Sequence, residues 1–193
     1  REVGEYTPDV RPWMAVNPDW ELLPVARANG ITHIVPVPSG GIVTGQSGLI
    51  ALDGWTVEEM AFKAPVALHL FWPNMRLDPT PREALIDKSR FKSLEDQAKE
   101  RTARIKDLDD FFSDAESYAR VRSSSGQIPA WEAMIPFLNK EIPLMVHADD
   151  ARQIKAAVEW AAERKYRIII AGGRDAWMHA DLLASNKTPV LYE

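Results

Sequence analysis

The sequence predicts an α/β protein built around a parallel sheet, and three observations support this. In the last third of the chain, short apolar runs alternate with amphipathic segments of helical length. The apolar runs are continuous, which is typical of parallel strands that helices cover on both faces. The chain has 193 residues and six strand candidates, whereas a closed (β/α)8 barrel takes about 250 residues. We therefore expect one domain over residues 1–193, either an incomplete barrel or an open doubly wound sheet.

The first half of the chain is predicted to contain short elements joined by loops. Residues 1–16 lack periodicity and are expected to form a loop. Asn17 is a favourable N-cap and Asn29-Gly30 is a typical stop signal, so a helix is expected between them. Thr56 and Glu59 have the spacing of a capping box, which predicts a brief second helix. Three strands are expected, at Ile31–Val37, Leu49–Leu52 and Pro65–Phe71.

The middle of the chain changes to a helical pattern, which we interpret as an insertion over residues 80–130. From Phe91 to Arg122 apolar residues recur three or four positions apart, which predicts one long amphipathic helix or two helices broken near residues 106–110. Residues 123–126 (SSSG) are expected to end it, and Trp131–Leu138 predicts another helix. The last third is expected to contain strands at Ile142–His147, Tyr166–Ala171 and Pro189–Tyr192 and helices at Ala151–Arg164 and Asp175–Ser185.

Composition narrows the classes of function that the chain can have. It contains no cysteine, which excludes disulfides, thiolate metal sites and thiol nucleophiles. Its net charge of −5 argues against a protein that binds the phosphate backbone of nucleic acids. No segment approaches the roughly 20 apolar residues of a membrane-spanning helix. We expect a soluble protein, cytoplasmic or exported, whose partner is a small-molecule substrate rather than nucleic acid or membrane.

Candidate metal ligands follow from the rule that parallel α/β folds bind ligands at the carboxyl ends of their strands. His147 ends an apolar strand, where an imidazole can ligate a metal. Alternatively, Asp149 or Asp150 caps the next helix and His147 only bonds the backbone. His69 lies near the end of its strand and points either toward the strand mouth or toward a helix. His33 and His179 are expected to be structural or at the surface.

Candidate substrate-binding residues lie in the loops at the same strand ends. Gly40 and Gly41 can bring backbone N–H groups close to an anion. The Gly172-Gly173 pair can present a helix N-terminus to a ligand or simply allow tight strand–helix packing. No serine triad and no HExxH motif is present. The predicted substrate-binding positions are Gly40, Gly41, Gln46, Trp72, Gly172 and Gly173.

Five sequence runs together resemble the amidohydrolase superfamily, specifically its imidazolonepropionase-like branch. The resemblance covers most of the chain apart from residues around 80 to 130. Its more specific parts are the GGxxxGQ and LDGW pieces, and the histidine positions are less specific. The runs are ARANGITH at 26–33, PSGGIVTGQ at 38–46, LDGW at 52–55, VHAD at 146–149 and AGGRDAW at 171–177.

The resemblance implies a metal-dependent hydrolase on a (β/α)8 barrel, of which this chain would lack the first strand and the C-terminal units. In that family the metal is held by an HxH pair, often a middle-strand lysine, histidines ending the fifth and sixth strands, and an aspartate ending the eighth. His147 matches the fifth-strand histidine, and His69 occupies the place of the lysine. The sixth-strand position falls at Gly172, where the sequence departs from the pattern. The HxH pair would lie before Arg1 and the aspartate after Glu193.

The resemblance further implies hydrolysis of C–N bonds, of a cyclic amide type, with zinc or a similar divalent metal as cofactor. The catalytic residues stay unassigned, and we expect the isolated chain to be inactive. A second hypothesis is a non-catalytic barrel relative that serves as a small-molecule binding or assembly scaffold. A third is an unrelated open sheet that binds a small anion at Gly172-Gly173. In the barrel readings, the missing strands would come from further chain segments or from another chain, for example in a homo-oligomer.

Overall fold

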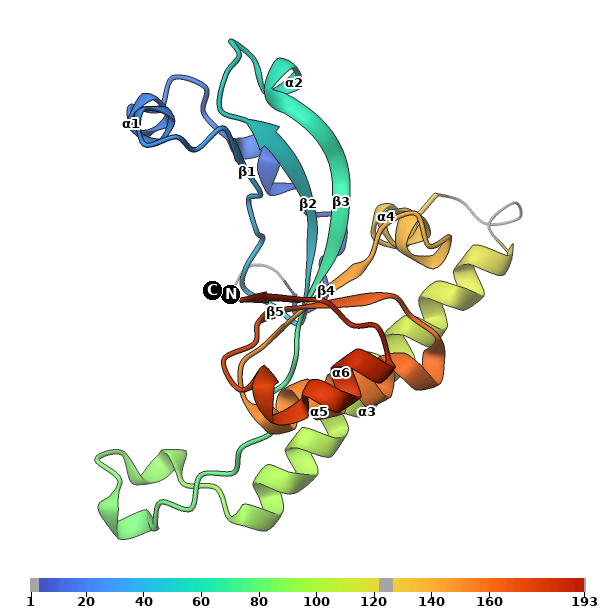
Figure 1. Ribbon diagram of the computed structural model, residues 1–193. Coiled ribbons are helices and arrows are strands. Elements are labelled where there is room, and N and C mark those ends of the chain that lie inside the picture. The colour runs from blue at the N-terminus through green and yellow to red at the C-terminus, as the bar shows by residue number, and fades with distance from the viewer. Residues whose placement is uncertain (1–3, 122–126, 193) are drawn as a thin grey trace.

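The computed structural model describes residues 4–121 and 127–192. They form a mixed α/β structure around a six-stranded sheet that curls as half of a barrel, with its strands in sequence order (Figure 1). This agrees with the predicted partial barrel. The strands are β1 (His33–Ile34), β2 (Val43–Ala51), β3 (Ala61–Phe71), β4 (Leu144–Ala148), β5 (Ile168–Gly172) and β6 (Val190–Tyr192).

The sheet is mixed, which corrects the expectation of a purely parallel one. Strands β3 to β6 are parallel, whereas β1, β2 and β3 pair antiparallel. The residues expected as a loop before Gln46 partly belong to the nine-residue strand β2. Its glycines are there because the N-terminal segment crosses the strand: a Cβ on Gly45 would lie 2.4 Å from the Val10 carbonyl oxygen, and one on Gly48 would lie 3.0 Å from the Trp13 ring.

Six α-helices accompany the sheet in the described part of the chain. Helix α5 has the predicted bounds, and α3 is one unbroken helix. The predicted end of α3 at 122–126 lies outside the described residues. Helix α1 starts later than predicted because Asn17 Oδ1 accepts the Asp19 N–H at 3.0 Å and forms a turn instead of a cap. The helices are α1 (Leu22–Ala28), α2 (Val57–Met60), α3 (Leu94–Val121), α4 (Pro129–Leu138), α5 (Ala151–Arg164) and α6 (Ala180–Ser185), with 3-10 turns at Pro12–Ala15, Arg82–Ala84, Lys88–Arg90 and Ala176–His179.

Helices α3 to α6 pack on one face of the parallel strands and form the main core with them (Figure 1). Alternate strand residues face these helices, and all are buried: Leu68, Leu70, Leu144, Val146, Ile168 and Ile170. The residues between them lie on the opposite, concave face. There Met145 and Ile169 are partly exposed, so the expectation that helices cover both faces does not hold within the described residues.

The β2–β3 ribbon rises away from the parallel strands and carries β1, α1 and α2 at its far end (Figure 1). These elements enclose a small second core of Trp13, Leu23, Ile50, Leu52 and Met60. None of the helices within the described ranges is long and apolar enough to cross a membrane.

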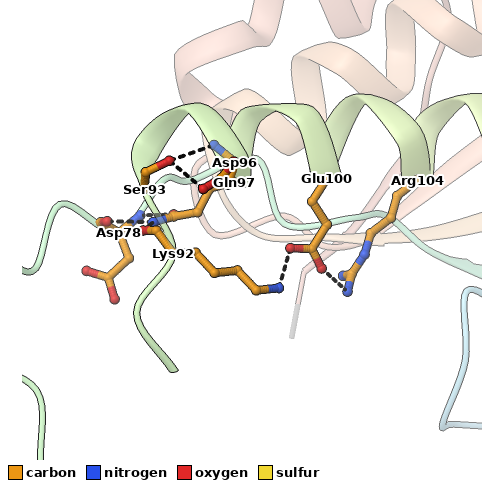
Figure 2. A network of polar contacts seen from close by, with 7 residues as sticks. All are labelled: Asp78, Lys92, Ser93, Asp96, Gln97, Glu100 and Arg104. Carbon is orange, nitrogen blue, oxygen red and sulfur yellow. Dashed lines mark hydrogen bonds and ion pairs between the residues drawn. The ribbon is translucent and has the colours of Figure 1, made fainter. Parts of the chain in front are cut away.

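The segment between β3 and α3 forms an arm that is fastened to the first turns of α3 (Figure 2). Gln97 holds it from both sides: its Oε1 accepts the Asp78 N–H at 2.8 Å, and its Nε2 donates to the Asp78 and Lys92 carbonyls at 2.9 Å each. Ser93 caps the helix by accepting the Asp96 N–H at 3.0 Å. Glu100 joins the two parts through its ion pair with Lys92, and it also pairs with Arg104 one turn further along α3.

Candidate functional site

The carboxyl ends of β3, β4 and β5 meet at one edge of the sheet and line a pocket of about 320 Å³. Parallel register brings Phe71, His147 and Ala171 side by side on the concave face, because Phe71 pairs with His147 and His147 with Ala171. The complete lining is Phe71, Trp72, His147, Ala148, Asp149, Gln153, Ala171 and Gly172. This is where the strand-end rule predicts a ligand site.

Two histidines from neighbouring strands meet at this edge. His69 Nδ1 lies 2.9 Å from His147 Nε2. His69 is fully buried, whereas His147 is half-buried and borders the pocket. The Phe71 ring stacks on the His147 imidazole with 4.1 Å between centroids and 6° between planes, which fixes the orientation of that imidazole. His69 therefore points to the concave face and not to a helix.

Burial determines the charge of His69. Desolvation, with a further contribution from nearby His147, lowers the pKa of His69 from 6.5 to about 4. The imidazole is neutral at physiological pH, which is the form that ligates metals. Its Nε2 is buried and has no hydrogen-bond partner in the described part of the chain.

The loop after β4 is held by a capping network around Gln153. Asp150 caps α5 by accepting the Arg152 N–H at 2.9 Å, and Gln153 Oε1 accepts the Asp150 N–H at 3.2 Å. Gln153 Nε2 also donates to the Trp72 carbonyl at 3.2 Å, which ties the loop after β3 to α5. The expected capping role of an aspartate thus belongs to Asp150, while Asp149 stays at the pocket.

Gly172 ends β5 beside Asp149 in a conformation that requires glycine. Its φ is +88°, and a Cβ there would lie 2.5 Å from Asp149 Oδ1. A histidine at this position would face both a strained backbone and the Asp149 carboxylate. The local geometry therefore favours glycine over histidine at position 172.

The other predicted substrate-binding residues do not line this pocket. Gln46 is buried, and its Nε2 donates to the Ala133 carbonyl of α4 at 2.5 Å. Gly41 lets the Glu5 backbone approach, since a Cβ there would meet the Glu5 oxygen at 2.6 Å. Gly40 has a φ of +107°, and a Cβ added there would have no atom within 4 Å. A Cβ on Gly173 would lie 2.6 Å from the Val190 side chain, so tight packing accounts for that glycine.

Trp72 lies at the pocket but contributes mainly packing. It is 4 % exposed, and its ring meets Trp160 of α5 edge-on with centroids 5.5 Å apart. Sequence reasoning did not identify Phe71 or Gln153 as residues of the site. The signal for Gln153 was its position three residues after Asp150, the spacing of a capping box. The signal for Phe71 was its place at the end of a strand next to that of His147.

The described residues bring two histidine nitrogens together at this edge but provide no complete metal centre. Within residues 4–121 and 127–192, no group of three or more histidine, cysteine, aspartate or glutamate side chains is placed to hold an ion. The site can bind a small ligand between Phe71, His147 and Asp149, with an aromatic wall, an imidazole and a carboxylate available for contact.

Comparison with known proteins supports the fold. No family model and no curated protein matches the sequence. Among solved structures, the chain is similar to the crystal structure of an amidohydrolase from Thermotoga maritima MSB8, with a TM-score of 0.81 and 23% sequence identity. The match covers 99% of this chain and 49% of that protein, so the chain spans about half its length. The amidohydrolase-like fold is thereby confirmed.

Proposed function

We propose that this chain forms one half of the catalytic barrel of a metal-dependent hydrolase that cleaves C–N bonds in cyclic, amide-type small molecules. The observation that carries the proposal is the pair of histidine nitrogens 2.9 Å apart at the carboxyl ends of two adjacent parallel strands. The similarity to a protein named an amidohydrolase agrees with it. The imidazolonepropionase-like subtype rests on the sequence resemblance.

The donor set fits part of a divalent metal centre such as a zinc site. In a tetrahedral site with metal–nitrogen bonds of about 2.0–2.1 Å, two ligand nitrogens lie about 3.3–3.4 Å apart, so the two imidazoles would move apart by about 0.4–0.5 Å to share one ion. His69 and His147 would be the ligands that this chain supplies. His69 would use Nδ1, the nitrogen that faces His147, because its Nε2 is buried in the protein. Further ligands would come from outside the described residues or from Asp149 in another rotamer.

The chain's own residues would orient and bind the substrate around such a centre. Phe71 holds the His147 ring by stacking, and the low pKa of His69 keeps its imidazole neutral. The Asp149 carboxylate beside Gly172 can accept a hydrogen bond from a substrate N–H or from water. A bound divalent metal would lower the pKa of a water ligand and polarise a substrate carbonyl.

A non-catalytic relative that uses the half-barrel as a binding or assembly scaffold is the second candidate. The observation that favours it is Gly172, whose conformation excludes a histidine ligand from β5. In this case the pocket would bind a small molecule without hydrolysing it, and the two histidines would interact through a hydrogen bond alone.

The test is elemental analysis of the protein encoded by the complete reading frame, together with a hydrolysis assay on a panel of cyclic amides. We expect bound zinc or a similar metal, with loss of both metal and turnover in His147→Asn. The matched control is His33→Asn. His33 is exposed on β1, away from the pocket, and its side chain forms a hydrogen bond with that of Thr32. A metal-free protein that binds cyclic amides without turnover would favour the scaffold. The isolated chain of 193 residues is expected to show no turnover with metal present.

A further inference from the structure

A second pocket, here called the basal pocket, lies at the opposite end of the strands, where β4 and β5 begin. It measures about 420 Å³ and lies between the C-terminal turns of α3, α4 and α5. Phe137 and Tyr166 form its aromatic floor, with ring centroids 5.0 Å apart. Its charged lining comprises Arg120, Lys140, Arg164, Lys165, Arg167 and Glu116.

Three of the five basic side chains have no acidic partner among the described residues. Arg120 lies 4.0 Å from Glu116, and Arg164 pairs with Asp109 at 2.7 Å. In contrast, Lys140, Lys165 and Arg167 form no ion pair with any residue in the described ranges. Glu116 is engaged further, because it accepts the Tyr166 hydroxyl at 2.5 Å.

Two of the unpaired cations sit in a backbone conformation that lysine adopts at a cost. Lys140 and Lys165 follow α4 and α5 with φ values of 64° and 57°. Glycine and asparagine take this left-handed helix end more easily. Lys187 has the same conformation after α6 and does not line the basal pocket, so the clustering of the cations, and not their backbone, points to a ligand.

The helix ends do not neutralise this charge. Each helix C-terminus carries about half a negative charge, so the three ends provide about one and a half. Glu116, Asp109 and Glu163 add three more negative charges against the five cations. A positive surplus of about half a charge remains, in a chain whose net charge is −5.

We propose that the basal pocket binds a small organic polyanion that carries phosphate or carboxylate groups. Lys140, Lys165 and Arg167 would contact the anionic groups, and the Phe137–Tyr166 floor would contact the body of the ligand. A volume of about 420 Å³ suits a small molecule rather than an extended polymer. The inference is independent of the proposed hydrolase, because the two sites lie at opposite ends of the strands.

The test is isothermal titration calorimetry at low ionic strength with inorganic tripolyphosphate and with citrate. We expect saturable binding of at least one anion at a single site, weakened at least about tenfold in the double variant Lys140→Asn/Arg167→Gln. Asparagine tolerates the left-handed backbone at position 140, so the fold is preserved. Tighter tripolyphosphate binding would indicate a phosphate-bearing ligand, and tighter citrate binding a carboxylate.

Two control variants separate the basal pocket from general electrostatics and from the candidate active site. Lys63→Gln/Arg82→Gln removes two exposed cations elsewhere and should leave the affinity within about twofold. His147→Asn should leave it unchanged, whatever becomes of the hydrolase activity. Absence of saturable binding by both anions, or equal weakening in the Lys63→Gln/Arg82→Gln control, would overturn the proposal.

Discussion

Replacing Gly172 by alanine tests the geometry that connects β5 to the candidate site. Gly172 has a φ of +88°, and the new Cβ would lie 2.5 Å from Asp149 Oδ1 and 3.2 Å from its Cγ. Two costs arise, one from the left-handed backbone and one from moving the Asp149 side chain. The substitution Gly30→Ala measures the backbone cost alone, because Gly30 has a φ of +83° and a Cβ added there would have no atom within 4 Å.

The expected magnitudes follow from these two environments. A left-handed alanine costs about 1–2 kcal/mol, and the loss of unfolded-state entropy returns about 0.4–1 kcal/mol. Gly30→Ala should therefore lower the free energy of unfolding by about 1 kcal/mol. Forcing Asp149 out of its rotamer adds about 1 kcal/mol, so Gly172→Ala should lose about 2 kcal/mol, or roughly 4–8 °C in Tm.

The assay is urea unfolding followed by circular dichroism, with Asp149→Ala completing a double-mutant cycle. Removing the carboxylate should relieve the close contact, so the two substitutions should be coupled by about 1 kcal/mol. If Gly172→Ala costs no more than Gly30→Ala, or if the cycle shows no coupling, then Asp149 does not occupy the space beside Gly172. In that case Gly172 would not exclude a histidine ligand either.

Three other predictions concern the protonation of the site, its loops and the arm. In metal-free protein, the folded-state pKa of His69, about 4, lies below its unfolded value, so stability is complete above about pH 6.5 and falls by about 3 kcal/mol toward pH 4. A histidine signal in NMR that titrates near 4 and disappears in His69→Gln checks this, and titration of all histidines above pH 6 would contradict it. Gln153→Ala should cost about 1–2 kcal/mol of unfolding free energy in urea melts, since it loses the loop contacts, whereas the exposed Lys155→Ala should cost less than about 0.5 kcal/mol. Gln97→Ala should speed trypsin cleavage within residues 76–92 by about fivefold with little change in Tm, because only the arm is released from α3. The control Lys99→Ala should not change the cleavage rate. Equal cleavage rates in the two variants would mean that Gln97 does not hold the arm.

The sequence predicted best where local signals agree with the tertiary structure. Helix α5 has an aspartate cap, a capping box and an apolar stripe, and its predicted and observed bounds coincide. Only the end of β2 was predicted, as the strand Leu49–Leu52, because the glycines earlier in β2 resemble a loop. Their function depends on Val10 and Trp13, more than thirty residues away, which cross the strand at those points. A contact of that kind leaves no periodic trace in the sequence.

The candidate site was predicted in part for a similar reason. The structure places His147, Trp72 and Gly172 at one pocket, because parallel strands end at the same edge. Gln46 lies away from this pocket, since its strand β2 pairs antiparallel with β3 and its amide donates to α4, 87 positions along the chain. The direction of His69 was ambiguous because the strand is apolar on both faces. The structure decides it by placing Leu68 and Leu70 against the helices.

The geometry around Gly172 limits where the remaining ligands of a metal centre can come from. The two nitrogens of His69 and His147 occupy the ends of β3 and β4, and β5 offers a glycine whose neighbour Asp149 fills the space of a side chain. A third ligand from β5 would require both a different residue and a displaced Asp149. Any complete centre must therefore draw on groups that reach the open, concave face from beyond the described strands, or on Asp149 after it rotates away from Gly172. In the second case Asp149→Asn in the complete protein should weaken metal binding about 10- to 100-fold, whereas in the first case it should leave metal affinity nearly unchanged.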